Sequence, residues 1–314
     1  NFLFDPHRQV FHICYNLDNG RLDANYYDLL ASEGRIASLV AIGKGDVPQS
    51  HWLHLSRPLT RTENGEEVLL SWSGTMFEYL MPPLLMRTYP TTLLYQSAYA
   101  TIDHQVAYGK RRNIPWGISE SGFYAFDASL NYQYHAFGVP GLGFKRGLGN
   151  DLVITPYASL LALPLQPEPV LQNLDLLKSQ GIIGRYGLYE AVDFTPERLG
   201  LGEEQAIVRS YMAHHQGMIM LALAATLQGN RMVERFHADP RIQSVELLLQ
   251  EQIPQDAPLQ FPHEEQNTPM RTAQPPLATH GWQAPLDTPL PLVHFLSNGR
   301  YGTLITNSGA GFSQ

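Results

Sequence analysis

The sequence predicts an all-α fold, arranged as a toroid or an array of α-hairpins with a functional site at one rim. Two observations support this prediction. Helical periodicity recurs in seven segments, at about residues 23–43, 74–88, 91–112, 151–163, 167–180, 203–228 and 240–251. The loops between these segments are long and rich in glycine and aromatic residues, which is typical of ordered loops that carry a function.

The first helical segment, 23–43, carries a charge where a core residue is expected. At about 100° per residue, Leu29, Ile36 and Val40 lie on one apolar stripe, and Glu33 falls on the same stripe. A carboxylate on a buried stripe is costly unless it has a partner or a chemical use.

The chain divides into three parts by composition. Residues 1–253 form the first predicted domain, which opens with extended segments and turns. Residues 254–291 contain nine prolines and no clear periodicity, which indicates a linker. Residues 292–314 alternate like a β-hairpin with SNGR as its turn, and are interpreted as the first strands of a truncated β-domain.

The composition excludes several classes of protein. The 314 residues carry a net charge of -8 with no Lys/Arg run, so no nucleic-acid partner is expected. Cys14 is the only cysteine, and no stretch is apolar enough to span a membrane. No signal peptide is visible and the chain starts at Asn1 without Met, which indicates a fragment of a longer protein.

Further isolated carboxylates lie in apolar or aromatic surroundings. Glu78 is the only charged residue of VLLSWSGTMFEYLMPPLLM, Glu120 is the only one of NIPWGISESGFYAF, and RYGLYEAVDF holds Glu190 and Asp193 among aromatic residues. Several carboxylates with aromatic walls and no metal are typical of glycoside cleavage or transfer, where one carboxyl donates a proton and a second attacks or activates water.

Aromatic residues of the same loops supply faces on which sugar rings can stack. Trp72 lies beside Glu78 in sequence, and Trp116 lies beside Glu120.

Each carboxylate also has a structural interpretation, which stays open at this point. Glu33 could pair with an arginine of a neighbouring helix, Glu78 could hold loop amides, and Glu120 could cap the next segment. Glu190 and Asp193 could pair with Arg185 or Arg209.

MAHHQGM lies within a helical pattern and contains two adjacent histidines, His214 and His215. Adjacent positions point about 100° apart, so they do not form the i, i+4 pair of a helical zinc site. We therefore favour histidines that contact a sugar or orient a carboxylate, with core histidines as the alternative. No metal and no cofactor are expected.

Six motifs together resemble a known family. YYDLLASEGRIASLVAIGKGDVPQSHW, LSWSGTMFEYLMP, PWGISESGFYAFD, FGVPGLGFKRGL, RYGLYEAVDFTP and SYMAHHQGM are similar to the glycoamylase-like middle region of bacterial cyclic β-1,2-glucan synthases, over about residues 1–251. The tail HFLSNGRYGTLITNSGAGFS resembles the start of the cellobiose-phosphorylase-like region that follows in those synthases.

The resemblance implies an (α/α)6 toroid, which could lack helices that lie upstream in the parent protein. It implies a retaining transglycosylase that closes linear β-1,2-glucan into a ring, with Glu33 as nucleophile and Glu120 as general acid/base. It places Glu78, Tyr189, Glu190, Asp193, His214, His215 and Gln216 in the glucan-binding cleft. Asp28, Trp72 and Trp116 are the other candidates for contacts with the glucan.

The resemblance also implies a partner and a location. β-1,2-Glucan is the expected ligand, and the remainder of a larger membrane-bound synthase is the expected partner. The fragment itself is expected to be soluble, on the cytoplasmic side of the bacterial inner membrane. An inverting endo-β-1,2-glucanase and a non-catalytic glucan-holding module are the two alternatives.

Overall fold

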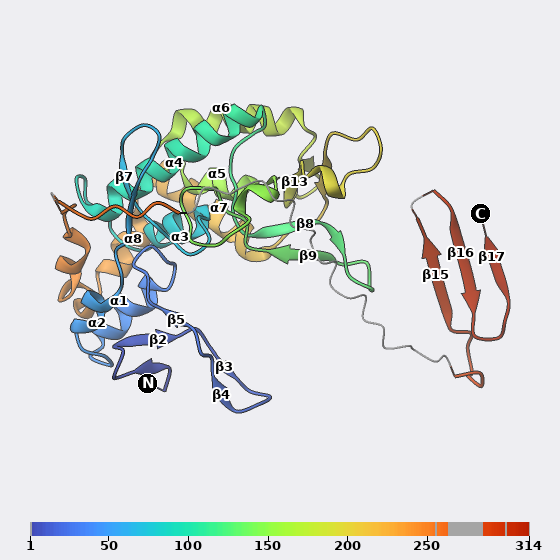
Figure 1. Cartoon of the computed structure of the whole chain (residues 1–314), viewed down its shortest axis with the longest axis horizontal. Coiled ribbons are helices and arrows are strands. Elements are labelled where there is room, and N and C mark those ends of the chain that lie inside the picture. Colours follow the sequence, from blue (N-terminus) through green and yellow to red (C-terminus); the bar gives the residue numbers. More distant parts are fainter. Residues whose placement is uncertain (1, 255, 263–284, 299, 314) are drawn as a thin grey trace. The chain divides into compact units, whose positions relative to one another are not determined.

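The computed structural model describes residues 2–254, 256–262, 285–298 and 300–313 (Figure 1). The chain divides into two compact units, Asn1–Met270 and Arg271–Gln314. Among the described residues, no helix is both long and apolar enough to cross a membrane.

The first unit contains α-helices and short 3-10 helices. The α-helices are α1 (Arg35–Gly43), α2 (Ser50–His54), α3 (Met76–Leu80), α4 (Leu93–Arg112), α5 (Pro156–Leu161), α6 (Pro167–Ser179), α7 (Ala213–Gln228), α8 (Arg231–His237) and α9 (Pro240–Gln243). The 3-10 helices are η1 (Pro82–Leu84), η2 (Leu148–Asn150), η3 (Pro196–Arg198) and η4 (Glu246–Gln250).

The same unit contains short antiparallel sheets. Its strands are β1 (Phe4–Asp5), β2 (Val10–His12), β3 (Tyr15–Asn16), β4 (Arg21–Leu22), β5 (Tyr26–Tyr27), β6 (Leu59–Arg61), β7 (Glu67–Leu69), β8 (Ser121–Phe126), β9 (Tyr132–His135), β10 (Val153–Ile154), β11 (Ile183–Gly184), β12 (Gly187–Leu188), β13 (Ala191–Asp193) and β14 (Ala206–Val208). They pair as β1-β2-β5, β3-β4, β6-β7, β8-β9, β10-β13-β14 and β11-β12.

The all-α prediction, an (α/α)6 toroid with long loops forming the cleft, is therefore wrong. The fold is mixed, because segments expected to be loop or helix form strands. The expected loop 113–151 contains the β8-β9 hairpin, whose alternating aromatic residues favour strands. The expected helix 203–228 begins with strand β14 and turns helical only at Ala213.

Two predicted helices are confirmed. The segment 91–112 forms α4, which ends at Asn113 in the left-handed conformation (φ 55°), a conformation that Asn adopts more readily than most residues. The segment 167–180 forms α6, which begins with Pro167 in its first turn, where a missing amide hydrogen costs nothing.

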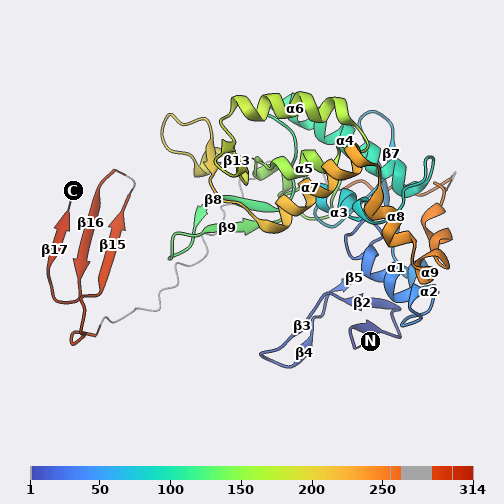
Figure 2. The same ribbon diagram turned by 180° about the vertical axis from the view of Figure 1, so that it is seen from behind.

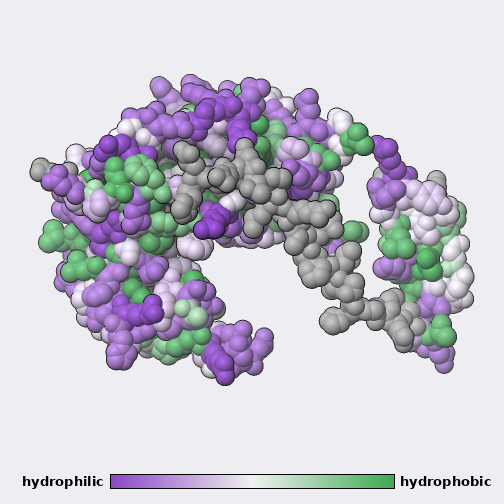
Figure 3. Space-filling view, viewed as in Figure 1, coloured by the Kyte–Doolittle hydropathy of each residue, from purple (hydrophilic) through white to green (hydrophobic). Residues whose placement is uncertain are grey.

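The core of the first unit lies between the central helices. Helix α5 packs against α3, α6 and α7, and α3 also packs against α4 (Figures 1 and 2). The β8-β9 hairpin lies beside the sheet of β13 and β14, because β8 contacts both strands. The outer surface visible in Figure 3 is largely hydrophilic with scattered apolar side chains.

The second unit is a three-stranded antiparallel sheet in the order β15 (Val293–Ser297), β16 (Gly302–Thr306) and β17 (Gly311–Ser313). The expected strand pairing of 292–314 is thus present, with Ser297 opposite Gly302 at the turn. Most of the predicted linker, residues 263–284, lies outside the described residues. Its described beginning belongs to the first unit, where Leu259 forms a parallel bridge with Leu59.

Candidate active site

Glu33 does not lie on a helix, contrary to the prediction. Helix α1 begins only at Arg35, and Glu33 occupies the turn just before it, where its carbonyl accepts the amide of Ile36. The helical periodicity of 23–43 fails because Tyr26 and Tyr27 pair with β2, which fixes this part of the chain as a strand. The carboxylate is partly exposed and accepts a hydrogen bond of 3.2 Å from the Ser32 hydroxyl.

The buried Arg35 fixes this turn to helix α3. Its guanidinium donates to the carbonyl oxygens of Ser32 (2.9 Å), Glu78 (2.7 Å) and Tyr79 (2.8 Å). Burial lowers the pKa of Arg35 to about 10, against the opposing charge of Glu33, so the residue stays a cation at neutral pH. Within the described part of the chain, Glu33 forms no ion pair, so it remains available for chemistry.

Glu120 lies directly before β8 and is partly buried. Burial, then the negative charges of Glu33 and Glu78, raise the pKa of Glu120 from its ordinary value of 4.5 to about 7, against a hydrogen bond with Tyr134 that lowers it. The effect of Glu33 on this pKa means that the two carboxylates, 87 positions apart in sequence, share one electrostatic environment.

Tyr27 interacts with both acids. Burial, then the charge of Glu33 and a hydrogen bond with it, raise the pKa of Tyr27 to about 12, and the charge of Glu120 adds to this effect. The tyrosine therefore remains a neutral hydrogen-bond donor at any physiological pH.

Glu78 is a structural carboxylate beside the site. It forms a capping box with Thr75 at the start of α3, and its two oxygens accept the amides of Ser73 (3.1 Å) and Thr75 (2.9 Å) and the Ser71 hydroxyl (2.8 Å). Burial raises its pKa, and these hydrogen bonds oppose the rise. Its place in the glucan cleft stays a prediction, since its oxygens already have partners.

Glu190 and His215 form a buried pair behind the hairpin. Their side chains are 1% and 2% exposed, and Nδ1 of His215 lies 2.9 Å from Oε1 of Glu190. The same oxygen accepts the Gly122 amide at 3.1 Å, two residues after Glu120. The neighbouring side of the histidine ring stacks on Tyr157 with centroids 3.7 Å apart.

Three other candidates are held by structural contacts. Asp193 is fully buried in an ion pair with Arg198 (Nε to Oδ2, 2.7 Å) and not with Arg185 or Arg209. Trp116 is 6% exposed and belongs to the core. Gln216 donates to the carbonyl of Leu188 at 3.3 Å.

Four candidates remain accessible to a ligand. Trp72 is 62% exposed and lies between Ser71 and Ser73, which hold Glu78. Asp28 and His214 are also exposed, and Tyr189 is partly exposed beside Tyr211, at a ring distance of 5.3 Å. Burial, then the neighbouring His215, lower the pKa of His214, so it is neutral at pH 7.

Sequence reasoning missed Tyr27, Arg35, Tyr134 and Tyr157 as site residues. Tyr134 faces Gly122 across the β8-β9 ladder, and Tyr157 donates to the carbonyl of Glu120 at 2.9 Å. In the sequence, Tyr27 lies in the aromatic cluster NYY and Tyr134 lies in NYQYH, and these clusters could have indicated both residues.

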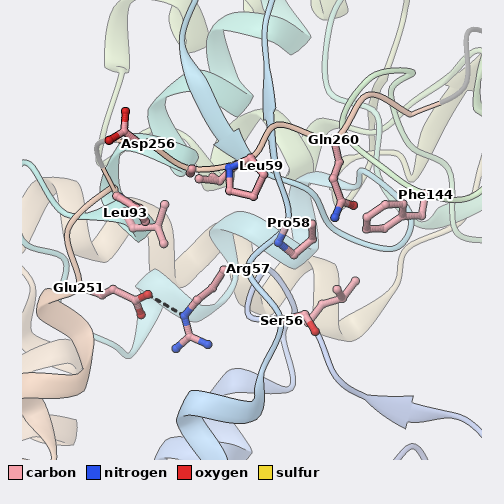
Figure 4. A pocket seen from close by; sticks show the side chains of 13 residues that line it. Ser56, Arg57, Pro58, Leu59, Leu93, Phe144, Glu251, Asp256 and Gln260 are labelled. Atoms are coloured by element: carbon pink, nitrogen blue, oxygen red, sulfur yellow. Dashed lines mark hydrogen bonds and ion pairs between the residues drawn. The ribbon is translucent and has the colours of Figure 1, made fainter.

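One cavity of the first unit lies away from these acids. It has a volume of about 640 Å³, and its lining includes Leu59, Phe144 and the ion pair between Arg57 and Glu251 (Figure 4). None of the candidate site residues lines it. The raised pKa of Glu120, to which the charge of Glu33 contributes, therefore lies outside this cavity. No group of three metal-ligating side chains occurs among the described residues.

Both parts of the chain are similar to known proteins. Residues 25–238 match the family model Glycoamylase, described as "Putative glucoamylase". Residues 281–314 match the supersandwich domain of glycosyl hydrolase 94. Over its whole length the chain is 44% identical to the cyclic beta-(1,2)-glucan synthase NdvB of Rhizobium meliloti, and it spans 11% of that protein.

Solved structures share the fold. One is a protein of Bacteroides fragilis described as a "putative glucoamylase", with a TM-score of 0.56 and 18% identity over 80% of this chain and 60% of that one. Another is the endo-beta-1,2-glucanase of Chitinophaga pinensis in complex with sophorotriose and glucose, with a TM-score of 0.53 and 19% identity over 77% of this chain and 59% of that one. Since the family model covers more than half of its residues, this chain belongs to the Glycoamylase family.

Proposed function

We propose that this chain is a retaining transglycosylase that acts on linear β-1,2-glucan and closes it into a ring. The observation that carries the proposal is the pair of acids: Glu120 has a pKa of about 7, and the charge of Glu33 contributes to it. A carboxyl that holds its proton near neutral pH can protonate a leaving oxygen, while an ionised carboxylate in the same environment can attack carbon.

The first half of the reaction breaks one glucosidic bond. Glu120 gives its proton to the glycosidic oxygen, and a Glu33 oxygen attacks the anomeric carbon from the opposite face. The leaving chain departs as an alcohol, and the remaining chain is bound to Glu33 as an ester. Trp72 provides an exposed ring on which a glucosyl residue can stack.

The second half forms a new bond. The 2-hydroxyl at the free end of the same glucan loses its proton to Glu120, and its oxygen attacks the anomeric carbon and displaces Glu33. Two inversions give net retention, and the product is a ring that is lighter by one water than the linear chain of equal length. Attack by water instead would give hydrolysis.

Ring formation is tested by mass spectrometry of linear β-1,2-glucan incubated with the chain. Products with the mass deficit of one water are expected from the unaltered chain and from the Glu204→Gln control, which changes an exposed loop carboxylate. Glu33→Gln and Glu120→Gln should form no rings. If both variants still formed rings, the chain would be a non-catalytic glucan-holding module. If the first product were an α-anomer, the chain would be an inverting glucanase.

The division of roles between the acids has its own test. With an aryl β-glucoside that needs no acid, azide added to Glu33→Ala should give the α-azide, because azide enters the empty nucleophile position. Azide added to Glu120→Ala should give the β-azide, because it attacks the ester on Glu33. The reverse pattern would exchange the two roles.

We further propose that residues 1–253 are a catalytic domain, 254–291 a linker and 292–314 the first strands of a β-domain within a longer membrane-bound synthase, on the cytoplasmic side of the inner membrane. The match of residues 281–314 to a glycosyl hydrolase 94 domain and the 11% share of NdvB support this organisation. Limited proteolysis should cut first within 254–291, and cleavage within 1–253 would contradict the boundaries.

A further inference from the structure

A chain of polar side chains runs from the buried interior to Glu120. Glu190 contacts Nδ1 of His215 at 2.9 Å, and Nε2 of His215 lies 3.4 Å from the Tyr134 hydroxyl. Tyr134 lies opposite Gly122 in the β8-β9 ladder, two residues after Glu120. The charge of Glu120 and a hydrogen bond with it contribute to the raised pKa of Tyr134. Three elements contribute to this chain of side chains: the segment before β13, helix α7 and strand β9.

The partners of His215 fix which of its nitrogens carries hydrogen. The Glu190 carboxylate can only accept, and one of its oxygens already accepts the Gly122 amide. Nδ1 must therefore be the donor. In the neutral ring Nε2 is then an acceptor, and it faces the Tyr134 hydroxyl.

The Tyr134 hydroxyl has one hydrogen for two acceptors. When Glu120 is protonated, its O–H can donate to the Tyr134 oxygen while Tyr134 donates to Nε2 of His215, so each group has a partner. When Glu120 is ionised, Tyr134 must donate to Glu120, and the buried Nε2 loses its donor. An acceptor without a partner in a buried position costs free energy.

We propose that Glu190 and His215 are positioning residues that reverse the hydrogen bond of Tyr134 at Glu120 between the two halves of the transfer, a role that rests on the proposed function. Neither Tyr134 nor His215 gains or loses a proton. The only proton transferred is that of Glu120, which goes to the leaving oxygen in the first half and returns from the attacking hydroxyl in the second.

As a consequence, Glu120 stays protonated between turnovers. The tautomer that Glu190 selects favours the arrangement with the proton on Glu120 until the glycosidic oxygen takes it. Once Glu120 is ionised, the Tyr134 hydroxyl turns to it and stabilises the charge. One residue thus serves as acid and then as base with no rearrangement larger than a hydroxyl rotation.

Other ionisable groups around this chain must be considered in its test. Glu120 also faces Glu33 and Glu78, whose charges raise its pKa. Tyr27 approaches from β5, where the charge of Glu120 acts on it.

His215 has two further ring neighbours, His214 on its own helix at 4.0 Å and Tyr157 on α5 at 3.7 Å. Neither changes in the variants below.

The test measures the pKa of Glu120 directly, by carboxyl ¹³C NMR of the glutamate-labelled chain without glucan. The Glu120 resonance is identified by its absence in Glu120→Gln. In Glu190→Gln the oxygen of the new amide can still accept the Gly122 amide hydrogen. The NH₂ group of the amide faces Nδ1 of His215 and donates to it, so the hydrogen of the histidine ring moves to Nε2. Tyr134 can then donate only to Glu120, so the pKa of Glu120 should fall by about half to one pH unit, the effect of one hydrogen bond.

Tyr134→Phe keeps the ring but removes the hydroxyl, so the pKa of Glu120 should rise. The double variant Glu190→Gln, Tyr134→Phe should titrate like Tyr134→Phe alone, because the effect of Glu190 passes through that hydroxyl. His215→Gln, which places an amide donor near the Nε2 position, should also lower the pKa and serves if Glu190→Gln does not fold.

Two results would overturn the proposal. One is an unchanged Glu120 pKa in the single variants at Glu190 or His215. The other is an equal fall with and without the Tyr134 hydroxyl, which would mean a through-space effect of charge. Because no glucan is present, these results stand whether or not ring formation is observed, and a failed ring assay leaves them interpretable.

Discussion

The raised pKa of Glu120 makes a prediction about stability that needs no substrate. A carboxyl whose pKa is higher in the folded state than in the unfolded state binds its proton more tightly when folded. Between the unfolded value of 4.5 and the folded value of about 7, rising pH therefore removes stability, and the loss is complete above about pH 7.5. Glu120→Gln, which cannot ionise, should recover that loss.

The magnitude follows from the difference between the two pKa values. The pKa of Glu120 is higher in the folded state by about 2.5 pH units (about 7 against 4.5). One pH unit corresponds to about 1.36 kcal/mol, so the stability lost by ionising Glu120 is at most about 3.4 kcal/mol. Because Glu120 is only partly buried and solvent screens its charge, we expect about 1–2 kcal/mol. For a unit of this size the melting temperature should rise by about 2–6 °C at pH 8 and very little at pH 4.5.

Thermal unfolding followed by circular dichroism at both pH values measures this effect. Glu246→Gln is the matched control, because the pKa of Glu246 is lowered in the folded state whereas that of Glu120 is raised. Burial raises the pKa of Glu246, but its hydrogen bond with Tyr89 and the charge of Arg87 outweigh burial and lower it. Its ionised form therefore stabilises the fold above its unfolded pKa, so Glu246→Gln should destabilise at pH 8 and have little effect at low pH. A Glu120→Gln chain that is equally stable or weaker than the unaltered chain at pH 8 would refute the reasoning.

Three further variants separate binding from packing. Trp72→Ala should weaken glucan binding about tenfold in calorimetry with an unchanged melting temperature, because the exposed ring packs on little else. Trp116→Ala should cost about 3–5 kcal/mol in urea unfolding, because the ring lies in the core, and a change in binding alone would contradict that placement. Arg35→Met should cost about 3 kcal/mol, because three carbonyls lose their donor, and an unaltered urea midpoint would show that they find other partners.

Much of the helical structure could be predicted where periodicity is long and unambiguous. Helices α4 and α6 match their predicted ranges within two residues at each end. The predicted helix 23–43 is present only from Arg35 to Gly43. Its first part is not helical, because Tyr26 and Tyr27 pair with His12 and Phe11 of β2. Pairing of this kind depends on tertiary contacts, which periodicity does not contain.

The acids of the candidate site could be selected as candidates from the sequence, because isolated carboxylates in apolar surroundings are costly and therefore stand out. The residues that shift the pKa values of these acids could not be predicted from the sequence. Tyr134 reaches Glu120 only because the β8-β9 register places it opposite Gly122, and a shift of one residue would turn it to the other face. Likewise Glu190 meets His215 across 25 positions, a contact that sequence spacing does not reveal.

The environments of the three neighbouring acids explain why they divide into different roles. Burial raises the pKa of both Glu78 and Glu120, but Glu78 accepts two loop amides and two hydroxyls, and these donors stabilise its charge. Glu120 has the Tyr134 hydroxyl, whose hydrogen is also within reach of His215. Four donors stabilise the charge of Glu78, whereas the charge of Glu120 has one shared donor, which fits the proposed role of Glu120 as the acid. Glu33, partly exposed in its turn before α1, carries the charge that helps to hold that proton in place.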